Sequence, residues 1–180
     1  ACSIVYSPDG TKLIAGCKDN TIKVWDFVEE TVSGLEGHLL SVTALTISSD
    51  GKILISGSTD RTIKVWELST GELLNTITGH NEMITALAMS RDGKILASAS
   101  ADKTIKLWSL PDGALLKTLS KHTGWVTSLI ITPDGKQLIS GSRDKTIKIW
   151  SFPRGTLVKT LEGHNDWVTS LAITPDGKNF

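Results

Sequence analysis

A pattern of about 42 residues occurs four times in this chain and begins a fifth time. A histidine recurs at steps of 42 residues and a tryptophan at nearly the same step, and five Asp-Gly pairs keep the same spacing. Repetition at this period is typical of stacked supersecondary units, because such a unit cannot bury its apolar surface alone. The recurring residues are His38, His80, His122 and His164, and Trp25, Trp66, Trp108 and Trp150.

Each copy contains four short β-prone runs separated by turn residues. In the second copy these runs cover 41–48, 52–58, 62–68 and 72–78, with Asp and Gly between them. Runs of this length with such turns predict an antiparallel meander. The second run is apolar on both faces, which favours a small sheet covered by a neighbour on each side.

The charge balance and the cysteine count restrict the class of protein. The chain has 19 basic and 19 acidic residues, whereas a nucleic-acid or membrane-surface protein usually carries a clustered basic excess. We therefore expect no nucleic-acid partner and no membrane. Two cysteines in 180 residues make no disulfide framework, which predicts a reducing, cytoplasmic location. We also expect no cofactor.

Several motifs in the same register resemble the WD40 β-propeller family. Gly-His pairs stand at Gly37-His38, Gly79-His80 and Gly163-His164, and a Trp-Asp pair stands at Trp25-Asp26. The resemblance implies an all-β fold, with four antiparallel blades of four strands each and the first strand of a fifth blade. The blades are expected at 1–36, 37–78, 79–120 and 121–162, with a partial blade at 163–180.

The same resemblance implies a closed ring of seven or more blades. Four blades and part of a fifth would then be a segment of a longer propeller. The alternative is that two or more copies associate to close a ring, because each blade interface resembles the next. An open arc would otherwise expose apolar faces and strand edges.

In the family, a loop His, a turn Asp, a second-strand Ser and a third-strand Trp form a hydrogen-bonded chain within a blade. Transfer of this chain to the present sequence leaves the Ser open, because Ser58, Ser100 and Ser142 share the strand face of the preferred residues. The implied sets are His38, Asp60, Ser56 and Trp66; His80, Asp102, Ser98 and Trp108; and His122, Asp144, Ser140 and Trp150.

A catalytic Ser-His-Asp triad or a metal site is the alternative role for these histidines. Three equivalent copies would mean three active sites, and the chain has no Gly-x-Ser-x-Gly motif. The histidines also fall in different blades without a cysteine pair nearby. A structural role is therefore predicted, with no catalytic residue and no metal ligand.

Departures between the copies provide the candidate binding residues. Large or basic side chains gather at the positions that form the top rim in the family, and such a surface could hold a peptide or an acidic segment. The alternative is that the two tryptophans pack between blades. The candidate residues are Lys18, Arg61, Met83, Lys103, Trp125, Arg143, Lys145 and Trp167.

The first copy differs most from the others. Ala15 replaces the Ser of the polar chain, and the Gly of the last turn is missing. Cys2 and Cys17 take the places of a Thr and a Ser that we expect to lie opposite each other. The pair is interpreted either as two buried thiols or as a cross-strand disulfide.

These features together predict a non-catalytic scaffold or regulatory domain that binds other proteins or peptides. The uniform copies are similar to bacterial WD40 arrays that are attached to signalling modules, so the chain could be one domain of such a protein. The alternative is the propeller platform of an enzyme whose catalytic residues lie outside this segment. A purely structural or decaying sequence is a third option.

Overall fold

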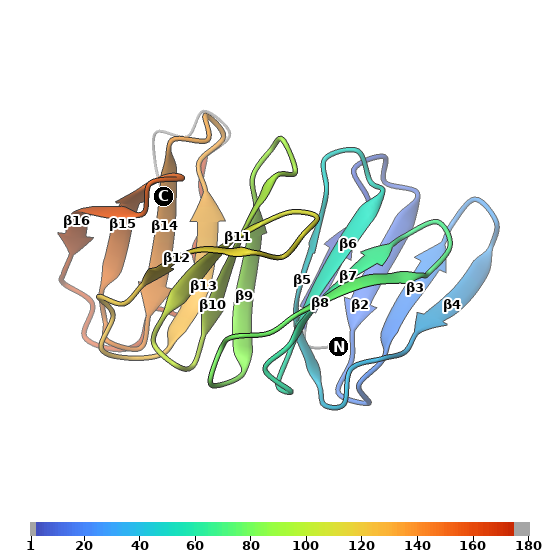
Figure 1. The fold of residues 1–180 in the computed structure, drawn as a ribbon, viewed down its shortest axis with the longest axis horizontal. Helices are drawn as coiled ribbons and strands as arrows, with labels where there is room; N and C mark the ends of the chain where they lie inside the picture. Colours follow the sequence, from blue (N-terminus) through green and yellow to red (C-terminus); the bar gives the residue numbers. More distant parts are fainter. Residues whose placement is uncertain (1–2, 175–180) are drawn as a thin grey trace. The chain divides into compact units, whose positions relative to one another are not determined.

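The computed structural model describes residues 3–174 as an all-β chain divided into two compact units, Ala1–Ile84 and Thr85–Phe180 (Figure 1). The described residues form four sheets of four antiparallel strands, and each sheet is a meander of consecutive strands. The all-β fold of four-stranded sheets predicted from the sequence is confirmed.

The strand bounds follow the repeat. In the first two sheets the strands are β1 (Ser3–Tyr6), β2 (Lys12–Gly16), β3 (Ile22–Asp26), β4 (Thr31–Leu35), β5 (Val42–Ile47), β6 (Ile53–Ser58), β7 (Ile63–Glu67) and β8 (Leu73–Ile77). In the last two they are β9 (Ile84–Met89), β10 (Ile95–Ser100), β11 (Ile105–Ser109), β12 (Leu115–Leu119), β13 (Val126–Ile131), β14 (Gln137–Ser142), β15 (Ile147–Ser151) and β16 (Thr156–Leu161).

The four Asp-Gly pairs that keep the repeat spacing within residues 3–174 form the hairpin turns between the first and second strands of the four sheets. At the β13–β14 turn, Asp134 Oδ1 accepts hydrogen bonds from the Thr132 hydroxyl at 2.6 Å and from the Lys136 amide at 3.0 Å. Gly135 has a φ of 67°, a conformation that costs a residue with a Cβ about 1–2 kcal/mol. The short polar side chain and the Gly together fix the turn, which explains why both recur in every copy.

The expected pairing of a Thr with a Ser across the first two strands of a blade is wrong, because a β-bulge shifts the register there. In the fourth sheet Val126 pairs with Ser142 and Ser128 with Gly141, so Thr127 is an extra residue. Its hydroxyl donates to the Gly141 carbonyl at 3.0 Å. The second sheet has the same bulge at Thr43. The Thr therefore lies beside the partner Ser rather than opposite it, because the extra residue shifts the register.

The cysteine pair cannot be judged from this geometry because Cys2 lies outside the described residues. Cys17 is partly exposed, and its Sγ lies 3.7 Å from the Ala15 carbonyl oxygen. The two interpretations of the pair remain predictions.

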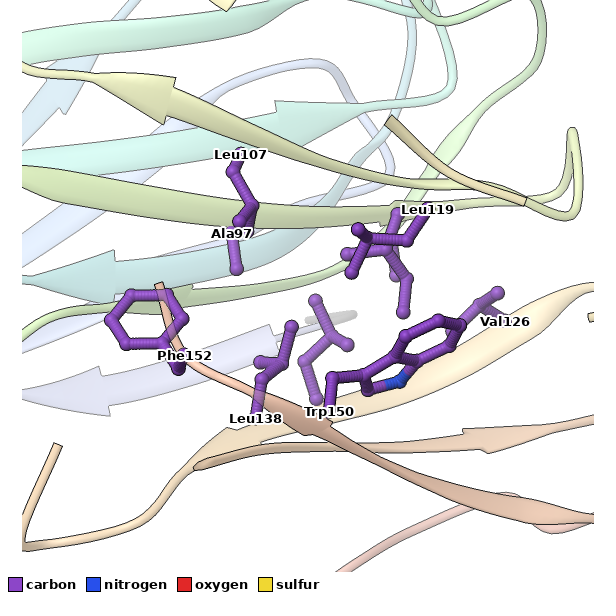
Figure 2. Close-up of a cluster of buried hydrophobic side chains, with 10 residues drawn as sticks. Ala97, Leu107, Leu119, Val126, Leu138, Trp150 and Phe152 are labelled. Atoms are coloured by element: carbon purple, nitrogen blue, oxygen red, sulfur yellow. The ribbon is translucent and has the colours of Figure 1, made fainter. Parts of the chain in front are cut away.

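Each unit has its own apolar core between its two sheets. In the first unit the core contains Ile14, Ile22, Leu54 and Trp66. In the second unit Ala97, Leu107 and Leu119 face Val126, Leu138, Trp150 and Phe152 across the space between the sheets (Figure 2). Burial of one such large side chain stabilises the fold by about 1.5–3 kcal/mol. The sheets thus cover each other's apolar faces, as the two-sided apolar runs indicate.

The first sheet keeps the common fold with different local chemistry. Ala15 is buried at the position of the polar-chain Ser and offers no hydroxyl. Glu30 adopts a φ of 51° where the later copies have Gly71, Gly113 and Gly155 at φ values of 64–74°. The left-handed position of the turn is therefore retained although its residue is not a Gly.

The segment after Leu161 contains no sheet strand within the described residues. The strand that we expected to open a fifth blade has no ladder partner there, and a strand needs such a partner for its hydrogen bonds. The segment instead docks on the fourth sheet. The Val168 amide donates to the Ser142 carbonyl at 3.1 Å, and the Val168 side chain is buried.

Candidate functional site

The second unit joins His122, Asp144, Ser140 and Trp150 in one hydrogen-bonded chain. The Trp150 Nε1–H donates to Ser140 Oγ at 2.9 Å, and Ser140 Oγ lies 2.8 Å from His122 Nε2. At the other side of the ring, Nδ1 lies 2.6 Å from Asp144 Oδ2. The four groups come from β14, β15 and the loops before β13 and β15, so the hydrogen bonds link four segments of the blade.

The first unit repeats this arrangement with His38. Nε2 lies 2.8 Å from Ser56 Oγ, which accepts from the Trp66 Nε1–H at 2.8 Å. Nδ1 lies 2.9 Å from Asp60 Oδ2. The imidazole and the indole meet edge to face in both units, with ring centroids 6.4 and 6.2 Å apart.

The residues of the third set belong to different units. His80, buried, lies in the first unit, whereas Ser98, Asp102 and Trp108 lie in the second. Within the second unit, the Trp108 Nε1–H donates to Ser98 Oγ at 2.8 Å. This half of the arrangement matches the other two blades.

The geometry distinguishes the two candidate serines of each blade. Ser56 and Ser140 contact the imidazole. The alternative residues instead stabilise the turn before the third strand: the hydroxyls of Ser58 and Ser142 accept the backbone amides of Asp60 and Asp144, each at 3.0 Å.

The proton positions follow from what each group can donate. The indole can only donate, so the Ser oxygen accepts from it and gives its own proton to Nε2. Nε2 is then the acceptor of a neutral imidazole, and Nδ1–H donates to the carboxylate. Burial lowers the pKa of His38 and His122 below 6.5, which favours this neutral form.

The carboxylates at the end of the chain stay ionised. Burial raises the pKa of Asp60, but hydrogen bonds from the Thr62 hydroxyl, the Leu39 and Thr62 amides and His38 outweigh burial and hold it at about 2. The pKa of Asp144 is lowered in the same way, by Thr146, His122 and the Thr123 amide against the effect of burial.

The connectivity Ser-His-Asp is that of a hydrolase triad, but the environment does not suit catalysis. Ser140 and Ser56 have no exposed surface, so a substrate cannot reach the hydroxyl. Each Ser oxygen also accepts a hydrogen bond from the indole N–H, so a lone pair that a nucleophile would need is already engaged. The arrangement therefore links segments within the blade. We call each set of hydrogen-bonded Trp, Ser, His and Asp side chains the brace.

Two other site classes find no support in residues 3–174. This part of the chain contains no group of three or more His, Cys, Asp or Glu side chains placed to hold a metal ion. It also has no helix long and apolar enough to cross a membrane.

The candidate binding residues of the second unit include a three-layer stack. The Arg143 guanidinium carbon lies 3.9 Å from the centroid of the Trp125 ring and 4.1 Å from that of the Trp167 ring. Trp167 is 52 % exposed and Trp125 is partly buried in the described structure. We call these three side chains the Trp-Arg-Trp stack.

The other candidate residues are not members of the stack, and three of them lie in the first unit. Lys103 and Lys145 are exposed, each at a φ of 70° in the turn after the second strand. Arg61, in the first unit, has the same φ and directs Nη1 toward the Asn81 carbonyl at 3.4 Å. Lys18 and Met83 also belong to the first unit, with Lys18 exposed and Met83 half-buried.

Sequence reasoning named the members of the stack but missed Gly124, which positions it. A Cβ on Gly124 would lie 2.6 Å from the Asp144 amide nitrogen, so a larger residue would push the loop away from the turn. The equivalent residues in the other copies are Leu40, Glu82 and Asp166. Comparison of the four copies at this position could have found it.

Removal of the central hydroxyl tests the brace. We expect Ser140→Ala to lower the free energy of unfolding by about 2–4 kcal/mol, because it leaves the buried Trp150 N–H and His122 Nε2 without partners. Urea denaturation provides the measurement.

The matched control is Ser128→Ala in the same blade. The Ser128 hydroxyl is buried and has no hydrogen-bond partner in the structure, and Ala44 and Ala86 stand at the equivalent positions. The same substitution should here be neutral or stabilising. Equal losses in both variants would contradict the assigned role of Ser140.

The pKa shifts predict a loss of stability in acid. The folded-state pKa of His38 and His122 lies below 6.5, so as pH falls through 6.5 the unfolded chain takes up protons first and the free energy of unfolding decreases. Below 3.8 the lowered pKa values of Asp60 and Asp144 add a further loss. Urea midpoints between about pH 8 and 5 should fall for the wild type and change less for His122→Gln. A flat wild-type profile would contradict the neutral buried histidines.

Comparison with known families agrees with the sheets and their recurrent motifs. The family model described as "WD domain, G-beta repeat" (WD40) matches residues 1–26, 29–67, 71–109, 113–151 and 155–180. Each complete match begins before the last strand of one sheet and ends with the third strand of the next. No curated protein matches the chain. Because the family model covers nearly all of the sequence, the chain belongs to the WD40-repeat family.

Proposed function

We propose that this chain is a scaffold or regulatory WD40 domain that binds a protein partner at the Trp-Arg-Trp stack. WD40 repeats generally mediate protein–protein interaction, and WD40 domains are typically non-catalytic. The observation that supports this site is an indole that is 52 % exposed and stacked on a guanidinium. Trp and Arg are the residues most enriched among those that dominate binding energy at protein interfaces.

The position of the stack in the repeat supports the same proposal. The complete brace occurs in two blades and its Trp–Ser half in a third, whereas within residues 3–174 the stack occurs at one place. At the position of Arg143 the other copies have Lys18, Thr59 and Ala101, and the copies before Trp125 have Met83 and Ser41 at its position. A feature that the common fold does not need is a candidate for a specific role.

The catalytic-platform alternative has no observation in its favour among residues 3–174. The acid–base groups of the brace are buried and hydrogen-bonded to one another, as described above. The binding role is therefore the function that the geometry supports best.

Selection of binders from a random peptide library tests the proposal. Peptides selected on the full chain should bind Trp125→Ala and Trp167→Ala at least about tenfold more weakly, because each variant removes one wall of the stack. Leu116→Ala is the matched control, since Leu116 is a large apolar residue of the same unit that is 53 % exposed. Isothermal titration measures the affinities. Peptides that bind both Trp variants as well as the wild type would show that the stack is not the binding site.

A further inference from the structure

The Arg143 side chain is fixed in place before any ligand arrives. Its guanidinium lies between two indole faces, at 3.9 and 4.1 Å from the ring centroids. Its backbone amide donates to the Trp125 carbonyl at 2.8 Å. Close approach of the loop at Gly124 holds the first indole against the turn. A long cation that is usually mobile thus has a defined position, which reduces the entropy that binding must remove.

The part of Arg143 that can form hydrogen bonds with a ligand is the N–H edge of its guanidinium, which carries five donors in one plane. The guanidinium carbon lies over the Trp125 ring and over the Trp167 ring. Within residues 3–174, no side chain forms an ion pair or a hydrogen bond with the Arg143 guanidinium. The edge therefore has donors to offer a ligand.

The carboxylates nearest in sequence are already engaged elsewhere. Asp144 Oδ2 accepts from His122 and from the Thr123 amide at 3.0 Å, and Oδ1 accepts from Thr146 at 2.6 Å. Asp166 Oδ1 accepts the Trp167 amide at 2.7 Å. The hydrogen bonds of the Asp144 and Asp166 carboxylates thus explain the positions of both groups without a contact to Arg143.

We propose that the N–H edge of Arg143 binds a carboxylate of an acidic peptide segment, with the two indoles contacting the apolar atoms beside it. This inference rests on the proposed function and names the chemistry that the stack recognises. A planar carboxylate matches the guanidinium fork in a bidentate pair.

The local charge favours a carboxylate over a phosphate. A phosphate group carries about −1.5 to −2 charges at pH 7 and is favoured opposite a cluster of Arg residues. Here the stack contains one Arg, with Lys145 two residues away and Asp144 and Asp166 adjacent in sequence to members of the stack. This balance suits a ligand with a single negative charge.

The test uses the peptides selected on the full chain, resynthesised in pairs that differ at one residue. The acidic residue that the selection enriches is replaced by its amide, glutamate by glutamine or aspartate by asparagine. Each peptide of the pair is titrated into the wild type, Arg143→Gln and Arg143→Lys. Arg154→Gln is the matched control, because Arg154 is exposed in the same unit and lies in the β15–β16 turn, at the other end of β15.

We expect the amide substitution in the peptide to weaken binding to the wild type about ten- to a hundredfold and to have little effect on Arg143→Gln. Arg143→Lys should lose most of the affinity, since an ammonium keeps the charge but not the fork. Arg154→Gln should bind like the wild type. The peptide change leaves the protein unaltered, so this arm remains informative if a variant fails to fold.

Three results would overturn the inference and leave the proposed function standing. They are selected peptides that depend on both tryptophans but lack a common acidic residue, full affinity in Arg143→Lys, and a phosphoserine peptide that binds more than about tenfold tighter than its glutamate counterpart. Binding that depends on neither tryptophan would instead overturn the proposed function.

Discussion

Two blades of this chain contain a serine hydroxyl that accepts a hydrogen bond from a Trp on one side and donates one to a His on the other. In the fourth blade the Ser140 hydroxyl accepts a hydrogen bond from Trp150 and donates one to His122. The His122 imidazole in turn donates a hydrogen bond to Asp144. These four side chains are buried or partly buried, so water cannot replace a hydrogen bond that is lost between them. Each loss would therefore lower the free energy of unfolding. The apolar core packs around Trp150, whose orientation this chain sets.

The repeated brace and the single stack illustrate two different demands on a repeat protein. Groups that hold a blade together recur in several copies because these copies form the same sheet, although the first copy has Ala15 in place of the Ser. Groups that recognise a partner need to occur once. In the second unit, both kinds of group meet at the turn before the third strand: Asp144 ends the brace, and the adjacent Arg143 forms the stack. The residue proposed to bind a partner is thus the sequence neighbour of the residue that ends the brace.

Most of the strands and the members of the brace could be predicted from the sequence, because the spacing of recurring residues indicates them. The period of the Asp-Gly turns gave the strands and their pairing, and the recurrence of His, Asp and Trp indicated a structural role. The family resemblance favoured Ser140, but the residues themselves left Ser142 as an alternative, because two residues that are two positions apart on a strand share a face. The bulge at Thr127 depends on an extra residue that leaves no composition signal. The stack depends on a loop position, which Gly124 sets through close packing with a distant turn.

The central claim is that the buried histidines are neutral links in a directional chain of hydrogen bonds. Imidazole nitrogen-15 chemical shifts, followed by NMR as pH is lowered, test it most directly. The account predicts that at pH 6.5 His38 and His122 are mainly neutral, with the proton on Nδ1 and a bare Nε2 that accepts from serine. Signals of a charged ring, or of the tautomer with the proton on Nε2, would contradict it.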